Sequence, residues 1–154
     1  MSVKISLKTC KFKDAKFLMN VYNSAVKGGF YNSTKMVVLK DHNKWLKLKL
    51  KSKSSKIYIG YKNKKKFGYV RFDKLKNNIF EVSIGNDTKF YGKKLGTAML
   101  RISIKKFINR YKPKKITSTV KKSNIRSQRC FLINNFKLVK FNKKKHVGIN
   151  KINT

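Results

Sequence analysis

Acidic residues, proline and cysteine are scarce in this chain of 154 residues. Asp and Glu together number five against 41 Lys and Arg, so the formal net charge is +36. Two cysteines, Cys10 and Cys130, are too few to build a disulfide framework, and we expect both to be reduced packing residues. One proline and eight glycines leave no Pro/Gly-rich linker. We therefore expect residues 1–154 to form a single domain with a sizeable core.

Long hydrophobic runs are also missing. The longest uninterrupted apolar stretches are as short as Met36–Leu39, because lysines interrupt every longer one, and this excludes a membrane-spanning helix. Residues Met1–Cys10 lack the apolar block of a signal peptide, which favours a cytoplasmic location. His42 and His146 have no metal-ligand spacing with the two cysteines, so we expect no metal site.

The large excess of positive charge favours anionic partners, with nucleic acid as the first candidate. Only five of the 41 cationic residues are arginine, and the chain is also rich in Asn, Ile, Phe and Tyr, a composition typical of AT-rich coding. Lysine clusters such as Lys64–Lys66 and Lys143–Lys145 fall in predicted turns rather than on one continuous face. We interpret most lysines as solvated residues that attract nucleic acid only through nonspecific charge. A basic nucleic-acid-binding module is the alternative from another class.

The hydrophobic periodicity predicts a mixed α/β protein with the element order β-α-α-β-β-β-α-β-α-β-β. Strands are expected at residues 5–9, 57–61, 67–73, 79–84, 115–120, 136–141 and 145–150. Helices are expected at residues 13–23, 41–49, 94–109 and 124–134. Pro113 stops the third helix, Asn124 caps the fourth, and Asn135 ends it in a left-handed conformation.

The segment 81–100 (EVSIGNDTKFYGKKLGTAML) has the local chemistry of a phosphate site. A strand ends, a loop holds Gly92, and a helix opens with Gly96 in its first turn, where approachable amide N–H groups and the helix dipole favour an anion. Three lysines surround the same spot: Lys89, Lys93 and Lys94. The alternative is that Gly92 only makes a turn and Gly96 only lets the helix pack closely on the sheet.

Two motifs at the right separation resemble the GCN5-related (GNAT) N-acetyltransferases. The pyrophosphate loop of that family, Gln/Arg-x-x-Gly-x-Gly/Ala, corresponds to Lys89–Lys94 (KFYGKK). A later signature, Asn-x-x-Ser/Ala-x-x-x-Tyr-x-x-x-Gly-Phe, corresponds to five residues here: Asn124, Ser127, Phe131, Asn135 and Phe136. The element order matches from about Ile5 to Phe141, so the resemblance covers nearly the whole chain.

The resemblance implies a mostly antiparallel mixed sheet of about seven strands with helices on both faces, splayed between the fourth and fifth strands. It implies an acetyltransferase in which an amine directly attacks the thioester of the co-substrate acetyl-CoA. The pantetheine arm would lie along the strand that contains Val82 and Ile84, and the pyrophosphate on the amides of Gly92–Thr97. The residues expected to bind acetyl-CoA are Val82, Ile84, Lys89, Gly92, Lys93, Lys94, Leu95, Gly96, Thr97, Asn124, Ser127 and Phe131.

Three positions depart from the family pattern. Lys89 replaces a Gln or Arg and keeps a long polar donor. Lys94 stands where a second Gly or Ala is usual, so its side chain must turn outward. Phe131 takes the place of a tyrosine that many members use to protonate the departing thiolate, so that role passes to another group, to water or to no group.

Glu81 is the expected catalytic base, acting through water. It is the only glutamate in the chain, and it lies on the strand where many family members keep a catalytic acid. If the following hairpin turned about Lys76, however, Arg71 would lie opposite Glu81 and form an ordinary cross-strand ion pair. A role in acceptor binding is a third alternative, and His42 is the second candidate for proton removal.

The segments 41–46 (DHNKWL) and 68–72 (GYVRF) resemble the aminosugar-nucleotide N-acetyltransferases of pseudaminic-acid-type pathways. This resemblance implies an amino-deoxysugar nucleotide as acceptor, with His42, Trp45 and Arg71 near it. Trp45 could instead be only a core anchor of its helix. A protein N-terminus, a lysine or a polyamine is the alternative acceptor, although a polyamine would be repelled by the charge. A homodimer is an open alternative to a monomer.

Overall fold

The computed structural model describes residues 4–31, 34–143 and 146–152, and its elements follow the predicted order. The strands are β1 (Ser6–Thr9), β2 (Ser55–Lys62), β3 (Lys65–Lys74), β4 (Ile79–Asn86), β5 (Lys115–Lys121), β6 (Lys137–Lys143) and β7 (His146–Ile152). The helices are α1 (Ala15–Lys27), α2 (Leu39–Lys51), α3 (Leu95–Tyr111) and α4 (Ile125–Ile133). Short 3-10 turns lie at Phe12–Asp14 and Thr88–Phe90.

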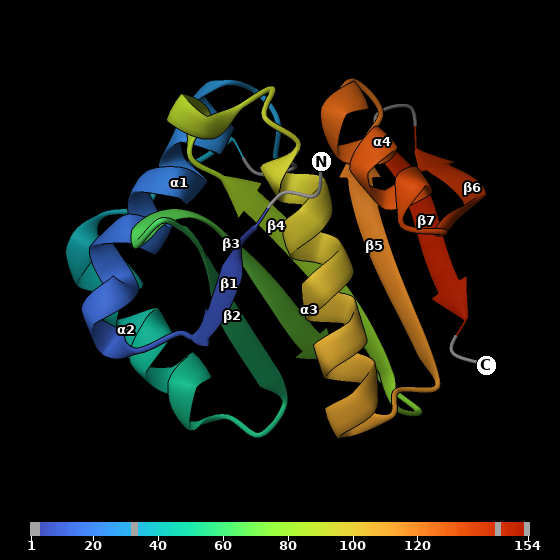
Figure 1. Cartoon of the computed structure of the whole chain (residues 1–154), viewed down its shortest axis with the longest axis horizontal. Helices are drawn as coiled ribbons and strands as arrows, with labels where there is room; N and C mark the ends of the chain where they lie inside the picture. Colours follow the sequence, from blue (N-terminus) through green and yellow to red (C-terminus); the bar gives the residue numbers. More distant parts are fainter. Residues whose placement is uncertain (1–3, 32–33, 144–145, 153–154) are drawn as a thin grey trace.

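The strands form one sheet in the order β1-β2-β3-β4-β5-β7-β6 (Figure 1). Every pair of neighbours is antiparallel except β4 and β5, which are parallel. Pairing between β4 and β5 joins only Ile79–Glu81 to Lys115–Thr117, although both strands continue beyond these residues. The predicted mixed, mostly antiparallel sheet and its splay between the fourth and fifth strands are confirmed.

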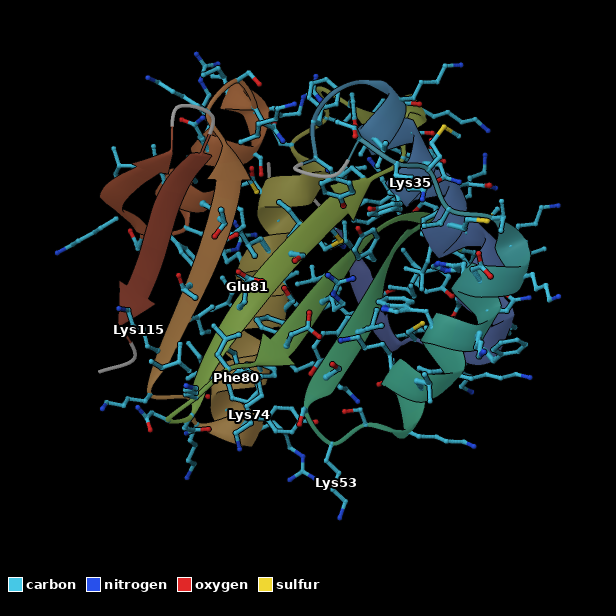
Figure 2. All side chains as sticks on the ribbon, turned by 180° about the vertical axis from the view of Figure 1, so that it is seen from behind. Lys35, Lys53, Lys74, Phe80, Glu81 and Lys115 are labelled. Atoms are coloured by element: carbon cyan, nitrogen blue, oxygen red, sulfur yellow. The ribbon has the colours of Figure 1, made fainter. Side chains whose placement is uncertain are left out.

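Helices pack on both faces of the sheet. Helix α3 contacts β1, β3 and β4 on one face, with α4 beside it, whereas α1 and α2 contact β2, β3 and β4 on the other. Alternation along β3 separates the two cores, because Val70 and Phe72 join the α3 core and Tyr69 joins the α1–α2 core. Seen from behind, α1 and α2 cover only one side of the sheet, and the face of β4 and β5 stays open (Figure 2).

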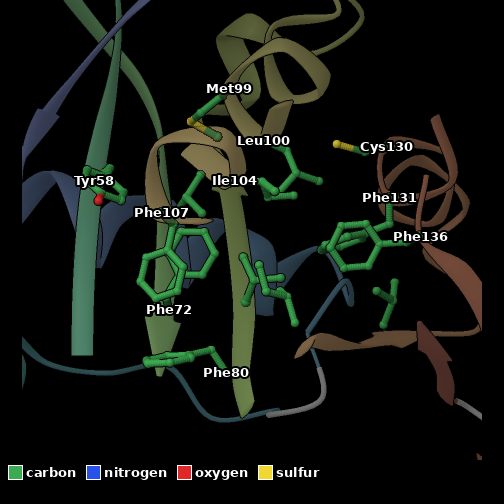
Figure 3. Packing of buried hydrophobic residues seen from close by; sticks show 14 of the residues in the cluster. Tyr58, Phe72, Phe80, Met99, Leu100, Ile104, Phe107, Cys130, Phe131 and Phe136 are labelled. Atoms are coloured by element: carbon green, nitrogen blue, oxygen red, sulfur yellow. The ribbon is translucent and has the colours of Figure 1, made fainter. Parts of the chain in front are cut away.

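Aromatic side chains attach α3 to the sheet (Figure 3). The rings of Phe72 and Phe107 stack with centroids 4.0 Å apart, and Phe80 meets Phe107 edge-on at 4.8 Å. Truncating a buried phenylalanine of this kind typically costs about 3–5 kcal/mol. This packing fixes the C-terminal half of α3 on the sheet, and the buried Leu95 and Met99 anchor its beginning beside β4.

Backbone conformation sets the ends of the helices. Helix α3 ends at Tyr111, and Lys112 takes a left-handed conformation (φ 46°) ahead of Pro113, which disfavours helical backbone in the residue before it. Asn124 caps α4 by accepting a hydrogen bond from the Ser127 amide, and Asn135 has φ 66° just after the helix. The predicted roles of Asn124 and Asn135 are confirmed.

Both cysteines are free and buried. Burial raises the pKa of Cys10 to about 12 and that of Cys130 to about 11, so neither thiol is a reactive thiolate at neutral pH. Within the described ranges, none of the helices has the length and apolar character needed to cross a bilayer.

Candidate functional site

Three neighbouring clefts share lining residues around the open face of the sheet. The first, called the loop cleft, has a volume of about 450 Å³ and lies between the end of β4, the start of α3 and α4. The second, the central cleft, has about 260 Å³ and lies over β4 and β5 on the open face. The third, the side cleft, has about 390 Å³ and lies between α1, α2 and the sheet. Tyr31 and Ile84 line both the loop and central clefts, and Tyr69 and Arg71 line both the central and side clefts.

The gap between the strands exposes the backbone of β4. Just beyond the last paired residues, the Ser118 hydroxyl of β5 donates a hydrogen bond to the Val82 carbonyl of β4 over 2.8 Å. In a strand, the N–H and C=O of one residue point to the same side, and alternate residues share that side. Val82 and Ile84 therefore both direct their backbone polar groups into the gap, where an extended amide-containing ligand could pair with them.

The first amides of α3 lie beside the loop cleft and have no hydrogen-bond partner in the part of the chain that the structure describes. Gly92 and Lys94 have φ values of 78° and 60°, so the chain turns sharply before the helix. The first amide of the helix with an intrahelical acceptor is that of Ala98, which donates to the Lys94 carbonyl. The amides of Leu95–Thr97 precede it, and such amides at a helix start favour an anion.

The three lysines near this turn occupy different places. Lys94 lines the loop cleft, whereas Lys89 and Lys93 lie outside its lining. Lys89 is exposed within the turn Thr88–Phe90, and the Lys93 ammonium lies 5.7 Å from the ring centre of Phe90. Of the three lysines, Lys94 is therefore the one that lies beside the helix amides in the loop cleft.

Two arginines of α4 complete the loop cleft, and our sequence-based prediction did not include them. Arg126 and Arg129 both line it, and the Arg126 guanidinium lies 3.8 Å from the ring centre of Tyr91. Only five arginines occur in the chain, and two of them lie three residues apart, on the same side of a helix. That spacing, directly after the Asn124 cap, is the signal that could have identified them.

Gly96 allows α3 to pack closely on β4. A Cβ atom at this position would lie 2.4 Å from the side-chain nitrogen of Asn86, so any larger residue would displace that amide. The oxygen of the Asn86 amide is buried and has no hydrogen-bond partner among the described residues. Asn86 and Gly96 both line the loop cleft, so Gly96 both packs closely on β4 and lies beside this cleft.

The residues of the later motif connect α4 to both clefts. Asn124 and Ser127 line the loop and central clefts, and the Asn124 amide also donates to the Phe30 carbonyl over 3.3 Å. Phe131 is 1% exposed and packs against Phe136 with ring centroids 4.9 Å apart. Phe131 is thus a packing residue in the wall of the central cleft.

Glu81 lies on the open face of the sheet and lines the central cleft (Figure 2). Its cross-strand partner is Asp73, and Arg71 lies opposite Ser83, so the predicted pairing of Arg71 with Glu81 is wrong. The hairpin turns through Asn77 and Asn78, both with positive φ. Its centre lies one residue after Lys76, so each β3 residue pairs with a β4 residue two positions later than expected. No ion pair involves Glu81 among the described residues.

Arg71 instead pairs with Asp73 on its own strand. The Arg71 Nε atom lies 2.8 Å from the Asp73 Oδ2 atom, and Lys49 and Ser55 bond the other carboxylate oxygen. Burial alone would raise the pKa of Asp73, but the charge of Arg71 and these hydrogen bonds hold it below its usual value. The guanidinium is thereby fixed between the central and side clefts.

The residues predicted to contact the acceptor meet in the side cleft. His42, Trp45 and Arg71 all line it. The Trp45 ring centre lies 5.3 Å from the His42 ring centre and 5.3 Å from the Arg71 guanidinium carbon. Trp45 is half-buried, whereas its neighbour Leu46 is fully buried. Leu46 is therefore the core anchor of α2, and His42 does not line the central cleft with Glu81.

Tyrosines that the sequence pattern did not single out line the junction of the clefts. The Tyr31 hydroxyl donates to the Ile84 carbonyl over 3.1 Å and is hydrogen-bonded to the Tyr69 hydroxyl. Burial raises the pKa of Tyr31 well above its usual value, so its phenol keeps its proton at neutral pH. Tyr31 reaches β4 from the loop after α1, a contact that no local pattern predicts.

Comparisons with known proteins support the fold. No family model matches the chain, and no curated protein matches its sequence. Its structure is similar to that of a spermidine N-acetyltransferase from Vibrio cholerae in complex with CoA and spermine, with a TM-score of 0.84, 11% identity and coverage of 96% of this chain and 95% of that chain. It is also similar to the Campylobacter jejuni N-acetyltransferase PseH in complex with acetyl coenzyme A. The TM-score is 0.74 and the identity 17%, with coverage of 98% of this chain and 100% of that chain.

A third similar structure is a domain from Methanocaldococcus jannaschii, with a TM-score of 0.81, 21% identity and coverage of 98% of this chain and 99% of that chain. At identities this low, the likeness establishes the fold. The predicted GNAT-like fold is thereby confirmed over nearly the whole chain.

Proposed function

We propose that this chain is an acetyl-CoA-dependent N-acetyltransferase. The observation that carries the proposal is the divergence of β4 and β5 beside the unpaired amides at the start of α3. The gap and the amides together suit a ligand with an extended amide-containing arm and a diphosphate. Two structures of the same fold hold CoA or acetyl coenzyme A.

The donor fits the loop cleft and the gap. Its diphosphate would contact the amides of Leu95–Thr97, with Lys94 and the two arginines of α4 supplying positive charge. The pantetheine amides would pair with the backbone of Val82 and Ile84. This arrangement places the thioester where the loop and central clefts join, and the strand amides there can stabilise the developing oxyanion.

We assign proton transfer to Glu81 in the central cleft and to Tyr31, which lines both the loop and central clefts. Glu81 removes a proton from the acceptor ammonium, directly or through water, so that a neutral amine attacks the acetyl carbon. As the C–S bond breaks, the thiolate takes a proton from the Tyr31 phenol, since Phe131 has no hydroxyl to give. Tyr69 or water then returns a proton to Tyr31.

An amino-deoxysugar nucleotide is the acceptor that we propose. His42, Trp45 and Arg71 lie together beside the central cleft, and PseH has the same fold. A polyamine is a poorer candidate, because Arg71 and Lys121 line the central cleft and Glu81 is the only carboxylate among its lining residues. A peptide N-terminus remains the alternative acceptor.

Release of free thiol from acetyl-CoA tests the function. The protein would be assayed with a uridine-diphosphate-linked 4-amino sugar, a peptide with a free N-terminus, and spermidine. We expect amine-dependent thiol release that is largest with the amino sugar. Absence of thiol release with every amine, together with absence of acetyl-CoA binding by calorimetry, would overturn the proposal.

A further inference from the structure

The side cleft has the character of a binding pocket for a ring. It lies between α1, α2 and the sheet, with a volume of about 390 Å³. Its walls are largely apolar and aromatic, including Leu18, Tyr22, Trp45 and Tyr69. A few polar groups among apolar walls are typical of pockets that bind small molecules.

His42 lines this cleft and has an unpaired polar atom among the described residues. Its side chain is more than nine-tenths buried, and its Nε2 atom has no hydrogen-bond partner among the described residues. Burial lowers the pKa of His42, and a hydrogen bond to the Ala15 backbone partly offsets this effect. In a neutral imidazole one ring nitrogen donates and the other accepts. Nε2 is the ring nitrogen without a partner among the described residues, and a buried acceptor needs a donor.

Planar groups surround this acceptor. The His42 and Trp45 rings are inclined by 31°, and the Arg71 guanidinium lies over the Trp45 ring. Arg71 is held in place by its ion pair with Asp73. A flat, unsaturated ligand ring would match these surfaces better than a saturated one, because aromatic faces and guanidinium planes stack on flat partners.

The side cleft adjoins the place where the amine would react. Tyr22, Tyr69 and Arg71 line both the side cleft and the central cleft that contains Glu81. One molecule can therefore place an amine near Glu81 and a ring beside His42.

We propose that the side cleft binds a planar unsaturated ring whose edge carries an N–H or O–H donor, and that His42 Nε2 accepts this hydrogen bond. The ring is the non-reacting end of the acceptor amine, a role that rests on the proposed acetyltransferase function. Two sources share this chemistry: the base of a nucleotide-linked amine, and the arene of a phenolic amine.

Direct binding tests the inference without requiring acetyl transfer. Trp45 is the only tryptophan in the chain, so its fluorescence reports on the side cleft alone. The full-length protein would be titrated with two pairs of probes, uridine with 3-methyluridine and tyramine with O-methyltyramine. Methylation removes the donor from each ring and leaves the ring itself intact.

We expect one unmethylated probe to change the Trp45 fluorescence and to bind at least about tenfold more tightly than its methylated partner. A response in the uridine pair identifies a nucleotide base, and a response in the tyramine pair identifies a phenolic amine. Equal affinities within both pairs, or no fluorescence change with either, would overturn the inference. Thiol release is measured separately, so a failure of the enzymatic function is distinguishable from a failure of this site.

A matched pair of variants locates the hydrogen bond. Asn at position 42 lacks the Nε2 acceptor, so His42→Asn should reduce the effect of methylation to less than about twofold. Lys44→Ala changes an exposed residue of the same helix that does not line the cleft and should preserve the full effect. If His42→Asn does not fold, the comparison of methylated and unmethylated probes in the unaltered protein still decides the matter.

Discussion

The two sides of the gap between β4 and β5 are built from different parts of the chain. On the donor side, the loop cleft presents backbone amides of Leu95–Thr97 and the backbone of β4. On the acceptor side, the central and side clefts are lined by the side chains of Glu81, His42 and Arg71. Under the proposed function, coenzyme binding would therefore rest on chain geometry, whereas acceptor choice and proton transfer would rest on individual side chains.

This difference predicts separable effects of substitution. Changes to backbone conformation on the donor side should alter acetyl-CoA affinity, and changes to the proposed proton-transferring side chains, Glu81 and Tyr31, should alter turnover. A variant that changed both quantities together would show that the two sides are not independent.

The largest effect is expected for Glu81→Gln. Losing the base should lower kcat by about 100-fold, while the acetyl-CoA Kd stays within about twofold, because Glu81 lines only the central cleft. Steady-state kinetics and calorimetry measure the two quantities, with Ser83→Ala on the same strand face as control. Near-normal turnover of Glu81→Gln would remove Glu81 from the mechanism.

On the donor side, Gly92→Val should raise the acetyl-CoA Kd by about tenfold. Gly92 has φ 78°, and a side chain in this left-handed conformation costs about 1–2 kcal/mol, which the loop can relieve only by moving its amides. Gly29 has nearly the same φ, 76°, and equally open surroundings, so Gly29→Val is a control for strain alone. An unchanged Kd in Gly92→Val would contradict the assignment of the anion site.

Tyr31→Phe should lower kcat by about tenfold, with water replacing the phenol as proton donor. A general acid fails as the pH rises through its pKa, and burial raises the pKa of Tyr31. The unaltered enzyme should therefore show no loss of rate from Tyr31 between pH 7 and pH 10. Tyr22 lines the central and side clefts but not the loop cleft, so Tyr22→Phe is the control. Equal rates in Tyr31→Phe and the parent enzyme would exclude Tyr31 as the acid.

The smallest effect is expected for Arg126→Ala. Arg126 is exposed, so its contact with a phosphate is screened and should contribute about 1 kcal/mol, or about fivefold in the acetyl-CoA Kd. The difference should shrink as salt is raised. Arg101, an exposed residue of α3 that does not line the loop cleft, provides the control variant Arg101→Ala.

Local features of the site were predictable from the sequence. The turn at Gly92 and the helix after it follow from neighbouring residues, and so does the Asn124 cap of α4. The element order follows from hydrophobic periodicity in the same way. Each of these features depends on a few consecutive residues, so a single sequence contains enough information to place them.

Features that depend on distant contacts were not predictable. The pairing of Asp73 with Glu81 depends on where the hairpin turns, and two asparagines with positive φ move that turn by one residue from Lys76. Tyr31 lies just after α1 and meets Tyr69 and Ile84 across more than thirty residues of chain. The hydrophobic periodicity of the sequence does not predict such a contact.

A crystal structure of the protein with acetyl-CoA tests the central claim most directly. The claim predicts a diphosphate within hydrogen-bonding distance of the amides of Leu95–Thr97, and a pantetheine arm paired with the backbone of Val82 and Ile84. A coenzyme bound elsewhere, or a gap closed to it by the Tyr31 ring at saturating acetyl-CoA, would contradict the claim.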